Sequence, residues 1–195
     1  HIWNKREVLE FIGESDRLLR PANYPATAPG AGAVLVPLKT GGYVGVLNLI
    51  GRIFMQAVDC PFITAKNKVA ELREKTKVII VDMHAEATSE KKALGWYLDG
   101  EVSAVLGTHT HVQTADEEIL PNGTAYISDA GMTGPFDSVI GIRKEAIIER
   151  FLTQMPNKFD LAKDDLRMQG VIMDIDVDSG KAKSIDRISV KLKDS

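Results

Sequence analysis

The fold is decided by one stretch of sequence, VIIVDMHAEATSEKKALGWYLDGEVSAVLGTHTH, at residues 78–111. It contains two apolar runs, VIIVDM (78–83) and VSAVLG (102–107), of the kind found in strands buried on both faces. Between them, SEKKALGWYLDG (89–100) has the pattern of a helix that ends at Gly100. A strand–helix–strand unit of this kind is almost always right-handed and joins parallel strands. The stretch therefore predicts an α/β domain.

Three of the four histidines in the chain follow the ends of these two strands. His84 comes directly after the first strand, and His109 and His111 come soon after the second. Neighbouring parallel strands end at the same edge of a sheet, where open α/β sheets bind their ligands. We therefore expect His84 to lie beside His109. In extended backbone, residues i and i+2 point to the same side, which would let His109 and His111 converge on one object.

A metal ion is the object that this arrangement favours, because neutral imidazole is the usual protein ligand for Zn, Fe, Mn and Ni. The alternative is that the histidines are hydrogen-bonded polar residues at strand ends, or partly exposed loop residues. Carboxylate, amide and hydroxyl groups surround them, and these either orient the rings or form ordinary caps and loops. They belong to Asp82, Glu86, Thr88, Ser89, Glu90, Thr108, Thr110, Gln113 and Thr114.

The remaining segments add more strands than helices. Strands are predicted at 33–38, 43–50 and 124–131, and a C-terminal hairpin at 170–192. Helices are predicted at 4–12, 64–75 and 137–152, the last with Asp137 as N-cap, and a Pro/Gly-rich loop at 20–32. Because the strands outnumber the helices that could cover them, a core of two sheets is favoured over one doubly wound sheet.

Composition limits the function further. Hydrophobic residues make up 44% of the 195 positions, so residues 1–195 are interpreted as a single domain with its own core. The net charge of −3 is too small to predict a nucleic-acid polymer or an acidic membrane surface as partner. Cys60 is the only cysteine, which excludes a disulfide framework and favours a reducing, cytoplasmic compartment. The apolar runs are shorter than a membrane span.

Several longer motifs resemble the YmdB-type bacterial branch of the calcineurin-like metallophosphoesterases. They are HAEATSEK (84–91), GWYLDG (95–100), GTHTHVQTADE (107–117), DAGMTGPFDSVIG (129–141), LRPANYP (19–25) and NLIGRIFM (48–55). The resemblance extends in order over essentially the whole chain. It implies a four-layer α/β/β/α sandwich with a dinuclear metal site at one edge.

The resemblance also implies roles for individual residues. His84 and His109 would bind one metal ion and His111 the other, with Fe or Mn favoured and Zn or Mg as alternatives. His1 would end the family's Gly-Asn-His motif and would stabilise or protonate the leaving oxygen. Many relatives have Asp where this chain has Asn4, so no role is implied for that side chain.

The family's other ligands are an N-terminal Asp, a Glu-Asn pair that includes a bridging carboxylate, and the Asn before His1. All of these would lie upstream of the first residue of the chain. We therefore expect the chain to be the C-terminal three-quarters of the family domain, with the N-terminal strands missing from it.

The expected activity is hydrolysis of phosphodiesters, cyclic nucleotides such as 2′,3′-cyclic AMP among them, by a hydroxide that two metal ions activate. The expected partner is this small molecule, and a homo-oligomer is compatible with the sequence. Tyr24, Phe54, Phe62 and Phe136 lie near loops and either line a base-binding pocket or pack in the core or an interface.

Two other classes of protein remain as alternatives. One is an inactive or non-catalytic module, regulatory or oligomerising, that keeps a residual three-histidine metal site. The other is a mononuclear zinc hydrolase, in which Glu86 or Glu90 would act as general base.

Overall fold

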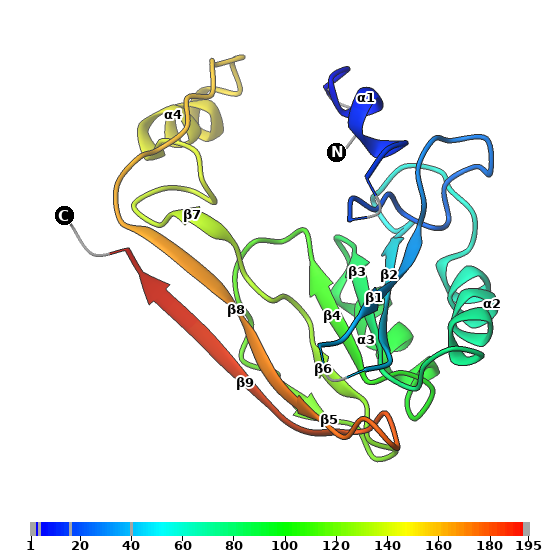
Figure 1. Ribbon diagram of the computed structural model, residues 1–195. Helices are drawn as coiled ribbons and strands as arrows, with labels where there is room; N and C mark the ends of the chain where they lie inside the picture. Colours follow the sequence, from blue (N-terminus) through cyan, green and yellow to red (C-terminus); the bar gives the residue numbers. More distant parts are fainter. Residues whose placement is uncertain (1–2, 4, 16, 40, 193–195) are drawn as a thin grey trace.

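The computed structural model describes residues 3, 5–15, 17–39 and 41–192. Within these residues the strands form two sheets, a larger one in the order β1-β2-β3-β4-β6-β5 and a smaller one in the order β7-β8-β9 (Figure 1). The expectation of a mixed α/β domain with two sheets is confirmed.

The larger sheet holds the predicted strand–helix–strand unit at its centre. Its strands are β1 (Ala33–Pro37), β2 (Tyr43–Ile50), β3 (Ile79–His84), β4 (Ala104–Thr108), β6 (Ala125–Ile127) and β5 (Glu118–Ile119). β2, β3, β4 and β6 run parallel, and β1 and β5 pair antiparallel at the two ends. The register pairs His84 with Thr108, so β3 and β4 end side by side.

Two layers cover this sheet. On one face pack α2 (Pro61–Arg73) and α3 (Thr88–Tyr97), whose apolar side chains join Ile79, Val81 and Met83 of β3 in the main core cluster. On the other face pack β8 (Leu166–Ile175) and β9 (Ala182–Lys191) of the smaller sheet, which also contains β7 (Thr133–Pro135). The parallel strands are therefore shielded from water on both faces, as their apolar sequences predict.

The short α1 (Val8–Ile12) and α4 (Lys144–Thr153) lie at the two sides of the upper end of the molecule in the view of Figure 1. α4 was predicted to begin at Asp137, and this is wrong. The carboxylate of Asp137 pairs with Lys144 instead, and the Ser138 hydroxyl accepts the N–H of Gly141 in a turn that precedes the helix.

The predicted strand at 124–131 is confirmed only over Ala125–Ile127. It ends there because side chains take over the next backbone N–H groups: Asp116 accepts that of Ser128, and Thr114 accepts that of Asp129. No helix among the described residues is long and apolar enough to cross a membrane.

Candidate metal centre

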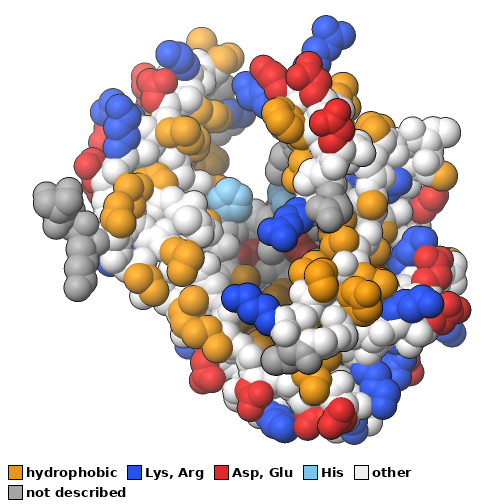
Figure 2. All heavy atoms as spheres, viewed as in Figure 1, with side chains coloured by type: hydrophobic (Ala, Val, Ile, Leu, Met, Phe, Trp, Pro, Cys, Tyr) orange, Lys and Arg blue, Asp and Glu red, His pale blue; other side chains and the backbone are white. Residues whose placement is uncertain are grey.

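The ends of β3 and β4 bring two imidazole rings into contact. Nε2 of His84 lies 3.1 Å from Nδ1 of His109, and the ring centroids are 4.8 Å apart. This is the neighbourhood that the parallel crossover predicts. Figure 2 shows histidine side chains in pale blue at a hollow in the surface.

The backbone at the third histidine differs from the prediction. His111 is exposed, and both His109 and His111 have positive φ, 95° and 67°. The H-x-H argument assumed extended backbone, in which alternate residues share a side, and this assumption is wrong for the loop. Among the described residues, no three His, Cys, Asp or Glu side chains converge in a ready-made metal site. His1 lies outside the described residues.

Hydrogen bonds fix the orientation of the His84 ring. The Thr108 hydroxyl donates to Oδ1 of Asp82 at 2.7 Å, while its oxygen lies 3.1 Å from Nδ1 of His84. Because the hydroxyl proton is used on Asp82, the oxygen accepts the Nδ1–H of the ring, and this leaves the lone pair on Nε2. The other Asp82 oxygen accepts from the Asn48 amide at 2.6 Å. The ring therefore presents an unprotonated nitrogen, of the kind that can bind a metal ion, toward His109.

The electrostatics of this cluster keep the ring neutral. Burial, followed by the nearby His109, lowers the pKa of His84 to about 4. Burial also raises the pKa of Asp82, although the hydrogen bonds from Thr108 and Asn48 oppose that shift. A neutral imidazole is the state in which histidine binds a metal ion.

The donor set fits a transition-metal ion. Two nitrogens that each lie about 2.1 Å from one tetrahedral ion are roughly 3.4 Å apart, and the two imidazole nitrogens here are separated by 3.1 Å. A small outward movement of the rings would admit the ion. The resemblance therefore agrees with the chemistry of these two side chains.

A buried ion pair holds the loop that joins His109 and His111. Lys91 of α3 and Asp129 lie 3.3 Å apart, and each side chain is only 1% exposed. Asp129 accepts the backbone N–H and the hydroxyl of Thr110, and Lys91 donates to the same hydroxyl at 3.0 Å. Thr110 stands between His109 and His111, so the ion pair fixes the backbone of the H-x-H loop.

Sequence reasoning missed Lys91 and Asp129 as site residues. A signal for Lys91 was present, because it precedes the core residues Leu94 and Leu98 by three and seven positions and so shares their face of α3. No spacing in the sequence relates Lys91 to Asp129, which lies in a different loop.

The two glutamates proposed as general bases have different surroundings. Oε2 of Glu86 lies 3.2 Å from Nε2 of His109, in contact with the ring pair. Glu90 is 8% exposed, and its carboxylate accepts the backbone N–H groups of Arg52 and Ile53. Glu90 therefore anchors the loop after β2.

A pocket of about 380 Å³ adjoins the imidazole pair. Its lining includes His84 and His109 together with Tyr24, Phe54 and the unanticipated Trp3. The other two aromatic candidates lie elsewhere, as packing residues: Phe62 packs edge-to-face on Tyr97, and Phe136 lies under the guanidinium of Arg167.

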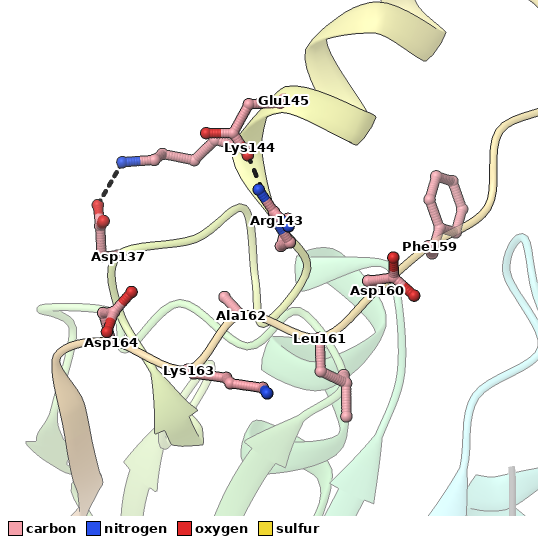
Figure 3. A pocket seen from close by; sticks show the side chains of 10 residues that line it. All are labelled: Asp137, Arg143, Lys144, Glu145, Phe159, Asp160, Leu161, Ala162, Lys163 and Asp164. Carbon is pink, nitrogen blue, oxygen red and sulfur yellow. Dashed lines mark hydrogen bonds and ion pairs between the residues drawn. The ribbon is translucent and has the colours of Figure 1, made fainter.

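A larger hollow, of about 690 Å³, lies at the base of α4 (Figure 3). Four of its charged side chains pair with each other, Lys144 with Asp137 and Arg143 with Glu145. No histidine lines it. Its chemistry therefore gives no reason to assign it a metal.

Comparison with known proteins defines the class. A solved structure from Mycoplasma pneumoniae, titled a novel phosphatase, is 33% identical with a TM-score of 0.87, over 97% of this chain and 69% of that one. A hypothetical protein of Thermus thermophilus gives 40% identity and a TM-score of 0.90, over 97% of this chain and 73% of that one. The fold is of the metallophosphoesterase type.

A sequence model of the YmdB-like proteins matches residues 1–188. A 2′,3′-cyclic-nucleotide 2′-phosphodiesterase of Bacillus subtilis is 50% identical over 97% of this chain and 72% of its own. A putative phosphatase/phosphodiesterase of Mycoplasma genitalium is 34% identical over the whole of this chain and 70% of its own. The chain belongs to the YmdB-like family. The expectation of an enzyme family that cleaves phosphoesters is confirmed.

Proposed function

We propose that this protein is a metal-dependent phosphodiesterase whose substrates are cyclic nucleotides such as 2′,3′-cyclic AMP. The observation that carries the proposal is the contact between the His84 and His109 rings at the joint end of β3 and β4. The substrate class is supported by the name of the Bacillus subtilis relative, which is 50% identical.

In this proposal His84 and His109 hold one transition-metal ion, iron or manganese, and His111 contributes to a second. When bound, the ions supply the positive charge that stabilises a phosphodiester in its transition state. Because burial keeps the His84 ring neutral, the ring does not have to lose a proton before it binds a metal ion.

The chain's own residues orient and hold these groups. Thr108 keeps the proton of His84 on Nδ1, because its own hydroxyl proton is bonded to Asp82. Lys91 and Asp129 immobilise Thr110 and with it the loop that bears His109 and His111. His1, in the role that the family resemblance implies, would give a proton to the leaving oxygen.

Turnover of 2′,3′-cyclic AMP tests the proposal. Metal-loaded protein is expected to hydrolyse it, chelation is expected to abolish turnover, and added Mn²⁺ is expected to restore it. His84→Ala should lower kcat/KM by roughly 100-fold or more, whereas Asn157→Ala, in the loop after α4, should not change it. Full activity after exhaustive chelation would refute the metal requirement. Failure of the metal-loaded protein to cleave the substrate would refute the substrate class.

A mononuclear zinc hydrolase is the second candidate, because Glu86 contacts His109 and could act there as a general base. Glu86→Gln would then abolish turnover at every pH while metal content stays the same. Unchanged activity in this variant would eliminate the candidate.

A further inference from the structure

Aromatic side chains from three separate segments surround the pocket beside His84 and His109. Trp3 comes from the N-terminal segment, Tyr24 from the loop before β1, and Phe54 from the loop after β2. The Trp3 and Tyr24 rings have their centroids 6.1 Å apart at an interplanar angle of 30°. A volume of about 380 Å³ lies within the range of small-molecule sites.

Phe54 is the most unusual of the three. Its side chain is 89% exposed, and its backbone has φ of 58°, in the left-handed region that bulky residues avoid. Both features cost free energy in the unliganded protein, and neither contributes to the core. A flat ligand that covered the ring would recover part of that cost by removing apolar surface from water.

The backbone around the pocket is firmly held. The carboxylate of Glu90 accepts the N–H groups of the two residues before Phe54, Arg52 and Ile53. The Asn23 side chain also bonds the backbone of Ile50, as donor to its carbonyl and acceptor of its N–H, and so fixes the neighbouring Tyr24. The aromatic walls are therefore preorganised to receive a ligand.

We propose that this pocket is a nucleobase subsite, in which the base of the substrate lies against Phe54, Tyr24 and Trp3. This inference rests on the proposed function, since the phosphodiester end of the same molecule would face His84 and His109. Base–aromatic stacking accepts any base, because every base has a π-face. The subsite would favour nucleoside phosphodiesters over other phosphodiesters without reading a particular base.

Binding of adenosine, which has no phosphate, tests the subsite separately from the reaction. Isothermal titration calorimetry with metal-loaded protein should show adenosine binding and much weaker binding of ribose. Phe54→Ala is expected to weaken adenosine binding about 10-fold, and Phe54→Tyr should largely preserve it. Phe151→Ala removes a similarly exposed aromatic side chain from α4 and serves as the matched control, with no change expected. Equal affinities for adenosine and ribose, or for Phe54→Ala and the unchanged protein, would overturn the proposal.

A kinetic comparison distinguishes failure of the nucleobase subsite from failure of the proposed function. The kcat/KM for 2′,3′-cyclic AMP should exceed that for base-free ribose 2,3-cyclic phosphate, and Phe54→Ala should reduce this ratio about 10-fold. If both substrates are cleaved with equal kcat/KM, the subsite is wrong and the phosphodiesterase function stands. If adenosine binds through Phe54 but neither substrate is cleaved, the subsite stands and the proposed function fails.

Discussion

The hydroxyl of Thr108 helps to set the orientation of the His84 ring. Thr108 lies between the ring and the Asp82 carboxylate, at 3.1 Å from one and 2.7 Å from the other. Without that hydroxyl the ring would lose an acceptor for its Nδ1–H, and the Asp82 carboxylate would lose a side-chain donor. Groups that orient a ligating imidazole commonly contribute as much to metal affinity as a weak ligand does.

Thr108→Val removes the hydroxyl with little change of shape. We predict that it lowers the affinity for Mn²⁺ by roughly 10- to 100-fold, measured by calorimetry, and that Thr108→Ser restores most of the loss. Thr153→Val on α4 provides a control in which affinity should not change. If Thr108→Val binds the metal as tightly as the unchanged protein, the assignment of the ring orientation to this hydroxyl is wrong.

The sequence predicted that His84 and His109 lie close together but did not predict the backbone at His111, and the roles of all three as metal ligands stay predictions. The first two are brought together by the parallel pairing of β3 and β4, a topological rule that apolar runs reveal. The placement of His111 depends on left-handed backbone in a loop, and hydrophobic periodicity carries no information about such dihedral angles. Trp3 was missed because its place in the pocket follows from tertiary packing alone.

Within α3, two consecutive lysines are placed in opposite environments. Lys91 is 1% exposed and paired with Asp129, whereas Lys92 is 36% exposed and paired with Glu118 at the surface. The helix turns by about 100° from one residue to the next, which sends one side chain into the core and the other to solvent.

We predict a large difference in stability between the two variants. Lys91→Met should lower the free energy of unfolding by about 3–5 kcal/mol, because it leaves the Asp129 charge buried without its cation. Lys92→Met should cost about 1 kcal/mol or less. Urea denaturation followed by circular dichroism measures both, and equal losses would contradict the burial of the Lys91–Asp129 pair.

β4 approaches the segment after β6 more closely than a side chain allows. A Cβ added at Gly107 would lie 1.7 Å from the carbonyl oxygen of Ser128, whereas one added at Gly134 in β7 would meet nothing within 4 Å. We predict that Gly107→Ala lowers the free energy of unfolding by about 1–3 kcal/mol or more. Gly134→Ala should change it by less than about 1 kcal/mol. Similar melting temperatures for the two variants would refute the close approach.

The elements that the sequence predicted accurately are those with strong periodic signals. β2, β3, β4, α3 and the C-terminal hairpin lie close to their predicted ranges. α4 and β6 were predicted too long because side chains such as Ser138 and Thr114 bind the backbone N–H groups near their ends. Hydrogen bonds between side chains and the backbone decide where such an element ends, and the spacing of apolar residues does not reveal them.

At the scale of the whole molecule, the buried Tyr126 makes the free energy of unfolding depend on pH in the alkaline range. Tyr126 of β6 is fully buried, and burial raises the pKa of its phenol to about 12 from the usual 10.0. The folded chain therefore keeps the phenolic proton at a pH at which the unfolded chain releases it. The free energy of unfolding is then unaffected by this group below pH 10 and falls as the pH rises toward 12.

We predict a loss of about 2–3 kcal/mol from this residue between pH 10 and 12. Urea titrations at a series of pH values measure it, and Tyr126→Phe should remove this contribution to the decline. The variant should also lose about 1 kcal/mol at neutral pH, because the hydrogen bond to Ser128 is absent. An identical alkaline decline in Tyr126→Phe would show that other groups cause it.

If His109 and His111 bind metal ions as proposed, their left-handed backbone lowers thermal stability at residues that the reaction requires. Each such conformation costs a non-glycine residue roughly 1–2 kcal/mol, and glycine at either position would relieve that cost. A laboratory selection for thermal tolerance alone would thus tend to discard both imidazoles. Under the proposed function, only a selection that also scored turnover would retain them.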